Sequence, residues 1–302
     1  MFEIVIISGK GGTGKTSITG ALACLAGESI LVDCDVDAAN LSLILNNRIE
    51  ESHEFIAGNK AKINQDKCNA CGECLRYCRF NAVTQSGESY RIEPLACEGC
   101  GVCRLFCPEE AIEFRPVKSG DWYRSTTPFG SLIHARLGIA QSNSGRLVTL
   151  LRQQARKLSA ERGNSQIIID GPPGIGCPVI ASITGAGFVL LVTEPSLTAF
   201  HDLKRVLELI RHFDIACGIC INKFDINPDL SAEIEKFADR NDVPVLGKID
   251  FDPTITTAQI NKSNFVDYST EVVQNQVKSL WKKLGEEISK PAKHKIKLNI
   301  IN

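Results

Sequence analysis

Short runs of aliphatic residues alternate with segments of helical spacing along most of the chain. These runs, rich in Val, Ile and Leu, lie at residues 4–8, 30–33, 166–170, 188–193, 215–221 and 243–249. Continuous apolar runs of this length are typical of strands buried on both faces of a parallel sheet. Between them, apolar residues recur every three or four positions, which predicts helices such as residues 145–158. The alternation predicts an α/β fold with a doubly wound, mainly parallel sheet.

The pattern changes between residues 58 and 115. Sustained strand or helix periodicity disappears there, and the segment holds eight of the thirteen cysteines. We therefore expect a discontinuous α/β domain, residues 1–57 and 116–302, with a small domain of residues 58–115 inserted in it. The sequence from 116 to about 142 is irregular and is expected to connect the two. A chain of 302 residues is long enough for both domains.

The first predicted strand leads into a glycine-rich turn and a helix. Gly9, Gly14, Lys15 and Thr16 fit every fixed position of the phosphate-binding pattern G-x-x-x-x-G-K-[ST]. Glycines let backbone N–H groups curl around phosphate oxygens, and the helix dipole adds positive potential. Lys15 is expected to reach the phosphates and Thr16 to ligate Mg²⁺. The predicted nucleotide-binding residues of this loop are Gly9, Lys10, Gly11, Gly12, Thr13, Gly14, Lys15, Thr16 and Ser17.

Aspartates follow two of the buried runs. Asp170 ends an all-aliphatic run and precedes a loop rich in glycine and proline, which is a Walker B pattern. Such an aspartate is expected to hold Mg²⁺ through water. Asp33, Asp35 and Asp37 lie at the end of another run, where α/β sheets place ligand chemistry. Asp33 is expected to be structural, whereas the pattern leaves the role of Asp37 open.

The cysteines of residues 58–115 form two runs with the spacing C-x2-C-x2-C-x3-C. This spacing resembles that of bacterial ferredoxins with two [4Fe–4S] clusters, in which the last cysteine of each run ligates the other cluster. The predicted ligand sets are Cys68, Cys71, Cys74 and Cys107 for one cluster, and Cys97, Cys100, Cys103 and Cys78 for the other. Zinc is the alternative, but zinc sites usually pair two C-x2-C knuckles. Arg79 departs from the second run, which has Pro108 there, and removes no ligand.

The loop and the cysteine runs together resemble a known group of proteins. Lys10, directly after the first glycine, makes the loop similar to the deviant Walker A loop of the MinD/ParA/Mrp superfamily. The chain is similar over nearly its full length to a P-loop ATPase of this superfamily that contains a small α+β ferredoxin-like domain. The resemblance implies ATP and Mg²⁺ as cofactors and slow hydrolysis. It also implies an ATP-dependent homodimer, or a heterodimer with a related ATPase.

The same resemblance assigns roles to individual residues. Lys10 would reach the nucleotide of the partner subunit, and Lys10 and Lys15 would neutralise the phosphate charge that develops during hydrolysis. Asp35 would position the attacking water, while Asp170 and Thr16 would place Mg²⁺.

Further candidates lie later in the chain. By resemblance, Asn222 would contact adenine, and Asp252 and Pro253 would belong to the loop that borders the base. Cys177 follows Asp170 by seven residues, near where the nitrogenase iron protein has a cluster ligand. We favour a buried loop cysteine for Cys177 over a ligand, because no second ligand of that kind is evident.

Two functions from different classes fit these observations. In the first, the protein couples nucleotide state to electron transfer or iron–sulfur delivery, with a redox or iron–sulfur client protein as partner. In the second, it is a positioning or assembly ATPase of the MinD/ParA kind, with the clusters as a redox sensor or docking module. An ATP-dependent amide ligase is a third, less favoured reading, because nothing beyond the nucleotide site suggests a carboxylate substrate.

Charge and hydropathy limit the partners. With 34 Lys and Arg against 35 Asp and Glu, net charge −1, no general attraction to nucleic acid or anionic lipid is expected. No apolar run is long enough to span a membrane, so we expect a cytoplasmic protein without stable membrane insertion. The apolar face of a helix at about residues 272–289 is expected to pack on the sheet, the alternative being a membrane-surface helix.

Overall fold

A computed structural model describes residues 2–138, 145–163, 166–261 and 269–290. The chain divides into two compact units. Unit 1 comprises Met1–Ser52, Trp122–Arg136 and Asn143–Asn302, and unit 2 comprises His53–Asp121 and Leu137–Ser142. The segment expected as an insert, residues 58–115, lies within His53–Asp121.

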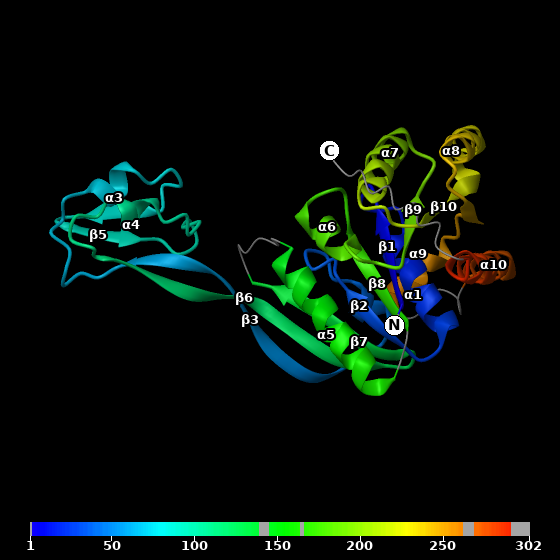
Figure 1. The fold of residues 1–302 in the computed structure, drawn as a ribbon, viewed down its shortest axis with the longest axis horizontal. Coiled ribbons are helices and arrows are strands. Elements are labelled where there is room, and N and C mark those ends of the chain that lie inside the picture. Colours follow the sequence, from blue (N-terminus) through cyan, green and yellow to red (C-terminus); the bar gives the residue numbers. More distant parts are fainter. Residues whose placement is uncertain (1, 139–144, 164–165, 262–268, 291–302) are drawn as a thin grey trace, which may run out of the picture. The chain divides into compact units, whose positions relative to one another are not determined.

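The main sheet has nine strands among the described residues, in the order β11-β10-β9-β1-β8-β2-β7-β6-β3 (Figure 1). Their bounds are β1 Phe2–Ser8, β2 Ser29–Asp33, β3 Arg48–Ile63, β6 Ile112–Thr127, β7 Gly130–Leu137, β8 Gln166–Pro173, β9 Phe188–Thr193, β10 Cys217–Asn222 and β11 Val245–Ile249. β1 pairs in parallel with β8 and β9, β2 with β7 and β8, and β10 with β9 and β11. The mainly parallel α/β fold predicted from the aliphatic runs is confirmed.

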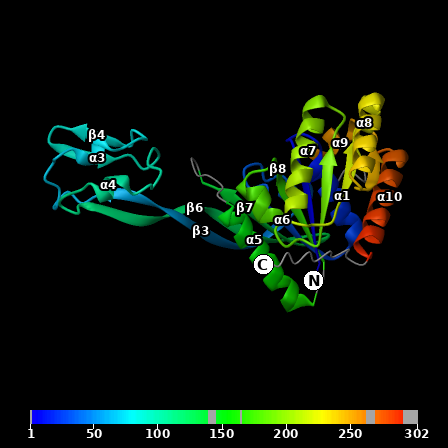
Figure 2. The same ribbon diagram turned by 45° about the horizontal axis from the view of Figure 1, so that its top comes forward.

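Helices cover both faces of this sheet (Figures 1 and 2). They are α1 Lys15–Ala26, α2 Leu41–Ile44, α5 Arg146–Arg162, α6 Cys177–Ile183, α7 Leu197–His212, α8 Pro228–Arg240, α9 Thr254–Ile260 and α10 Glu271–Ile288, with a short 3-10 helix at Phe224–Ile226. α1 and α10 share one core cluster with Ile4, Ile168 and Leu190 of the central strands.

The apolar face of α10 is buried in that cluster through Val273, Val277, Leu280 and Leu284, as predicted for a helix that closes the sheet. None of the helices in the described part of the chain is both long enough and apolar enough to cross a bilayer.

Three strands of the main sheet, β3, β6 and β7, were not predicted from the sequence. The segment from 116 to 142, interpreted as irregular, contains most of β6 and all of β7, so that interpretation is wrong. In β6, exposed and half-buried residues such as Arg115 and Lys118 interrupt the buried ones, and Pro116 and Gly120 add weak strand formers. β7 buries Ser131 and His134 among its aliphatic residues. Neither strand therefore shows the continuous apolar run that marks the central strands.

His134 of β7 lies in a buried polar network within unit 1. Its Nε2 is 2.8 Å from Ser125 Oγ, and its ring stacks on Tyr123 with the centroids 5.1 Å apart. Asn47 Nδ2 donates to the same Ser125 Oγ at 3.0 Å. Burial lowers the pKa of His134 to about 4, because the charged imidazolium loses its hydration.

This burial predicts a pH-dependent stability. Below the ordinary histidine pKa the unfolded chain binds a proton that the folded chain refuses, so the contribution of His134 to the free energy of unfolding falls from about pH 6.5 to about pH 4 and then levels off. His134→Gln, which cannot ionise, should remove about 3 kcal/mol of that fall. Urea unfolding at several pH values measures the difference. His201→Gln, at a side chain that is 70% exposed, is the matched control and should keep the parental pH profile.

Unit 2 is small, and its core combines aliphatic residues and a tyrosine with cysteines. Its elements are α3 Glu73–Arg76, the antiparallel hairpin β4 Val83–Ser86 and β5 Ser89–Ile92, and α4 Val102–Leu105, together with the adjoining parts of β3 and β6. The buried cluster of this unit consists of Ala61, Ile63, Cys74, Ala82, Val83, Tyr90, Cys97 and Ile112. Helices of four residues carry little periodicity, which explains why the helix and strand signals disappear in this segment.

Candidate functional site

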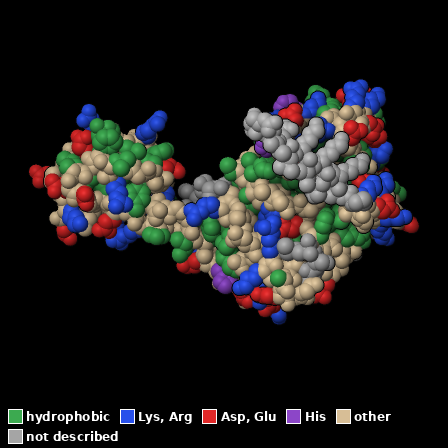
Figure 3. Space-filling view, in the orientation of Figure 1, with side chains coloured by type: hydrophobic (Ala, Val, Ile, Leu, Met, Phe, Trp, Pro, Cys, Tyr) green, Lys and Arg blue, Asp and Glu red, His purple; other side chains and the backbone are tan. Residues whose placement is uncertain are grey.

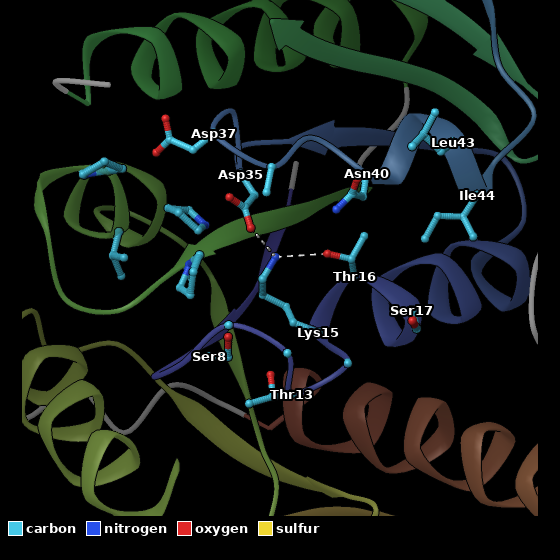
Figure 4. A pocket seen from close by; sticks show the side chains of 18 of the residues that line it. Ser8, Thr13, Lys15, Thr16, Ser17, Asp35, Asp37, Asn40, Leu43 and Ile44 are labelled. Atoms are coloured by element: carbon cyan, nitrogen blue, oxygen red, sulfur yellow. Dashed lines mark hydrogen bonds and ion pairs between the residues drawn. The ribbon is translucent and has the colours of Figure 1, made fainter. Parts of the chain in front are cut away.

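A cavity of about 700 Å³ opens at the carboxyl end of the central strands of unit 1 (Figure 4). The loop between β1 and α1 forms its floor, and segments after β2 and β8 form its walls. The lining residues are Ser8, Gly11, Gly12, Thr13, Gly14, Lys15, Thr16, Ser17, Asp35, Asp37, Ala38, Asn40, Leu43, Ile44, Pro172, Pro173, Gly176, Pro178 and Val179. Most of the predicted phosphate-binding loop thus faces one cavity, at the amino end of α1.

Gly14 is held where a side chain would not fit. Its φ is +85°, in the left-handed region, and a Cβ there would lie 2.3 Å from Asn222 Nδ2. Asn222 Nδ2 donates to the Thr13 carbonyl oxygen at 2.8 Å, so the end of β10 braces this turn. Asn222, predicted at the base, therefore also supports the loop itself.

A pair of substitutions in this loop tests the bracing. Gly14→Ala forces a side chain into the left-handed region and displaces Asn222, so the free energy of unfolding should fall by about 2–3 kcal/mol. Gly11→Ala is the matched control because a Cβ there meets no atom within 4 Å, and it should stay within about 0.5 kcal/mol of the parent. Chemical denaturation without nucleotide gives both values. Equal destabilisation by the two would contradict the role of Asn222.

Lys15 is buried between two acidic side chains. Its Nζ donates to Asp170 Oδ1 at 2.9 Å and lies 3.4 Å from Asp35 Oδ2, and Figure 4 shows it between Asp35 and Thr16. Burial opposes its charge, but Asp170 and Asp35 outweigh burial and raise the pKa of Lys15. Burial also raises the pKa of Asp35, despite the neighbouring Lys15. Lys15 therefore stays charged at the cavity floor.

Asp170 accepts hydrogen bonds from polar side chains at the amino end of α1. Thr16 Oγ1 donates to its Oδ2 at 2.7 Å, and Thr19 Oγ1 donates to its Oδ1 at 2.8 Å. The Thr16 hydroxyl and the Asp170 carboxylate, both predicted at Mg²⁺, are thus adjacent. Thr19 was missed by sequence reasoning, because it looks like an ordinary helical threonine; its position one turn after Lys15 was the available signal.

Asp33 shapes the segment that carries Asp35. Its Oδ1 accepts the Asp35 backbone N–H at 3.1 Å and its Oδ2 accepts the Leu41 N–H at 3.0 Å, which supports the structural role expected for it. Burial, together with Asp170, raises the pKa of the Asp33 carboxyl well above its ordinary value. Asp37 is exposed and, like Asp35, lines the cavity.

Lys10 points away from the cavity floor. Its Nζ donates to Thr198 Oγ1 at 3.1 Å and lies 3.6 Å from Glu194 Oε1, and its side chain is 40% exposed. Glu194 also accepts from Lys223 Nζ at 2.8 Å, and Lys223 donates to the Gly12 carbonyl at 3.0 Å. No sequence pattern predicts this Glu194–Lys223 pair, because its members follow two different strands. Gly9, in the same loop, lies against α7, where a Cβ would come within 2.7 Å of Asp202.

A smaller cavity of about 250 Å³ adjoins the loop on its other side. It is lined by Gly12, Gly14, Ser17, Ile18, Asn222, Lys223, Asp250, Phe251, Asp252 and Ile255. Asn222 and Asp252, both predicted at the base, meet here. The Asp252 carboxylate accepts the backbone N–H groups of Thr254 and Thr270, each at 2.9 Å, so it shapes the loop. Pro253 is exposed and is not part of this lining.

The eight cysteines of unit 2 fall into two groups of four. One cavity is lined by Cys68, Cys71, Cys74 and Cys107, with Ile63, Tyr90 and Ile112 among its walls. The other is lined by Cys78, Cys97, Cys100 and Cys103, with Tyr77, Phe80 and Phe114 among its walls. The fold thus brings together the same three-plus-one sets that the spacing predicts.

The surroundings of these cysteines are partly apolar. Burial raises the pKa of Cys74, and raises that of Cys103 to about 11. The backbone N–H of Ala82 donates to Cys78 Sγ and that of Ala111 to Cys107 Sγ, both at 3.3 Å. In the described residues, no group of three or more His, Cys, Asp or Glu side chains is arranged to hold a metal ion. The two [4Fe–4S] clusters therefore remain a prediction.

Cys177 differs from its favoured interpretation. It is exposed and begins α6, so the expectation of a buried loop cysteine is wrong. Burial of a residue directly after a glycine-rich loop depends on the next helix, which sequence spacing does not reveal.

Comparisons with known proteins place the chain in a family. The chain matches the CobQ/CobB/MinD/ParA nucleotide binding domain over residues 4–265, so it belongs to this family of P-loop proteins. It is 34% identical over 291 residues to the uncharacterized protein MJ0578 of Methanocaldococcus jannaschii, covering 95% of this chain and 98% of the relative.

Solved structures support the same fold. The septum site-determining protein MinD of Pyrococcus horikoshii, complexed with Mg-ADP, gives a TM-score of 0.56 at 19% identity and covers 94% of this chain and 95% of its own. The MinC:MinD cell division complex of Aquifex aeolicus gives 0.56 at 18% identity, covering 97% and 99%. At these identities the likeness concerns the fold alone.

Proposed function

We propose that this protein is an ATPase of the MinD/ParA kind that switches between nucleotide states. The observation that carries the proposal is the convergence of Lys15, Thr16 and Thr19 on the buried carboxylate of Asp170, below a phosphate-sized loop. Thr16 and Asp170 would hold Mg²⁺, which would neutralise phosphate charge. The adjoining cavity beside Asn222 fits an adenine base.

Within this site each side chain has a defined task. Lys15 would supply positive charge to the phosphates from the cavity floor, and the exposed Asp37 and the buried Asp35 also line the cavity. Asp35 would orient the attacking water. Lys10, which points outward, would act on the nucleotide of a second subunit, in a homodimer or in a heterodimer with a related ATPase.

The cysteine residues of unit 2 fit two [4Fe–4S] clusters. Each cavity offers four thiols in a partly apolar pocket, and backbone N–H groups point at the Sγ atoms of Cys78 and Cys107. Such N–H groups stabilise thiolate ligands and tune cluster potential. When bound, the clusters would supply reversible one-electron chemistry.

Two uses of these clusters follow. The match to MinD proteins favours a switch of the positioning or assembly kind, in which the clusters serve as a redox sensor or docking module. The paired cysteine cavities favour ATP-coupled electron transfer or cluster delivery to a client protein.

Anaerobic purification tests the proposal. ATP hydrolysis, nucleotide-dependent association by light scattering, iron content, and EPR with ADP or a non-hydrolysable ATP analogue are measured on one preparation. Spectra that depend on nucleotide, with electron transfer to a redox protein, would select the electron-transfer use. Hydrolysis that depends on the oxidation state, with nucleotide-driven association, would select the switch. A preparation that takes up no ATP would refute the nucleotide part, and one that holds zinc in place of iron would refute the cluster part.

A further inference from the structure

Unit 2 has an exposed apolar surface around a stacked ring pair. The rings of Tyr77 and Phe106 lie with their centroids 3.9 Å apart and their planes 15° apart. Around them, Leu105 is 82% exposed, Phe106 46%, Phe80 44% and Leu75 38%. We call Leu75, Tyr77, Phe80, Leu105 and Phe106 the aromatic patch. Contiguous exposed apolar side chains often mark interaction sites, whereas single scattered ones do not.

Two residues of the aromatic patch are covalent neighbours of cysteines that line the two cavities. Tyr77 precedes Cys78, which lines one cavity, and Phe106 precedes Cys107, which lines the other. Tyr77 and Phe80 also line the cavity of Cys78 themselves. α3 and α4, which carry Leu75 and Leu105, lie against each other. A molecule seated on the stacked rings would therefore be next to ligands of both predicted clusters.

Arginines accompany these apolar side chains. Arg76, Arg79 and Arg104 are exposed and alternate with the patch residues along the chain. The Arg76 guanidinium lies 5.4 Å from the centroid of the Tyr77 ring, and its partner Glu73 is 3.7 Å away. Figure 3 shows hydrophobic side chains with Lys or Arg side chains beside them on the part of unit 2 that carries α3. An apolar centre with a basic rim is complementary to a protein with an acidic rim.

We propose that the aromatic patch docks an acidic electron-transfer protein. The inference rests on the proposed function, because it needs unit 2 to hold its clusters. On docking, one electron passes from the reduced partner to unit 2; the partner is oxidised as unit 2 is reduced, and no atom is transferred. The arginines steer the encounter, and the apolar centre excludes water from the contact.

Reduction kinetics of the anaerobic full-length protein test this docking. The probe is a reduced, acidic two-cluster ferredoxin, followed by stopped-flow absorbance, with photoreduced deazaflavin as a small reductant for comparison. One variant combines Arg76→Gln, Arg79→Gln and Arg104→Gln, and a second carries Leu105→Asp. Arg91→Gln, at an exposed position of β5 in the same unit, is the matched control. Iron content is measured on every sample.

The expected result is a fall of about 10-fold in the second-order rate constant with the ferredoxin for both variants at low salt. For the arginine variant the difference should shrink as salt rises. Arg91→Gln, and all reductions by deazaflavin, should match the parent. Parental rates with the ferredoxin, or equal losses with both reductants, would overturn the docking proposal. A parent protein without iron would instead overturn the proposed function.

Discussion

Lys15→Ala is expected to lower the ATP hydrolysis rate by about 10²–10³-fold. The side chain is 6% exposed and supplies the positive charge at the cavity floor, beside Asp170 and Asp35. Phosphate charge that builds up in the transition state would then meet two carboxylates without their cation. Phosphate release at saturating ATP measures the rate, and ATP binding is measured in parallel.

Lys10→Ala is the matched comparison for ATP binding by a single chain. Lys10 is partly exposed and does not line the cavity, so its loss should leave ATP binding by a single chain unchanged. It should abolish nucleotide-dependent association and, with it, hydrolysis. Circular dichroism and urea unfolding identify any variant that is merely unfolded, since removing one member of a buried ion pair costs about 3–5 kcal/mol. Parental hydrolysis by Lys15→Ala would refute the catalytic assignment.

Paired cysteine substitutions should divide the iron of unit 2 by cavity, not by sequence run. Cys74 and Cys107 line one cavity although they belong to different runs, whereas Cys78 belongs to the run of Cys74 and lines the other cavity. Cys74→Ala with Cys107→Ala should reduce iron from about eight to about four atoms per chain. Cys74→Ala with Cys78→Ala should remove nearly all of it, because both clusters lose a ligand.

Iron analysis and EPR of the anaerobic proteins distinguish these outcomes. The single variants Cys74→Ala and Cys107→Ala serve as references, and each should retain about four irons. If the Cys74 and Cys78 pair instead retained half of the iron, the ligands would group by run and the assignment across runs would be wrong. Retention of zinc in every variant would contradict iron–sulfur binding altogether.

Sequence reasoning was most successful where chemistry depends on fixed local spacing. Gly14, Lys15 and Thr16 are consecutive, and a strand on one side with a helix on the other leaves a single geometry for the loop. The aliphatic run before Asp170 is equally local, although its contact with Lys15 spans 155 positions. Each cysteine set combines three cysteines of one run with the last cysteine of the other run. The ferredoxin pattern specifies this exchange of the last cysteines.

The features that were missed depend on contacts distant in the sequence. Thr19 becomes a site residue because α1 presents it to Asp170, and Glu194 because Lys223 follows a neighbouring strand. β3, β6 and β7 were missed because polar and charged residues interrupt their apolar ones, such as Lys118 in β6 and His134 in β7. The exposure of Cys177 depends on where α6 begins. None of these features leaves a periodic pattern or a motif in the chain.

The chain enters and leaves unit 2 on two neighbouring strands. β3, which leads into unit 2, and β6, which leads out of it, are hydrogen-bonded neighbours at the margin of the nine-stranded sheet of the described residues. An excursion that departs and returns on adjacent strands interrupts no pairing among the central ones, and insertions tolerate such closely spaced ends. A change in the length of unit 2, or its loss, would therefore leave the pairing of the central strands of unit 1 intact.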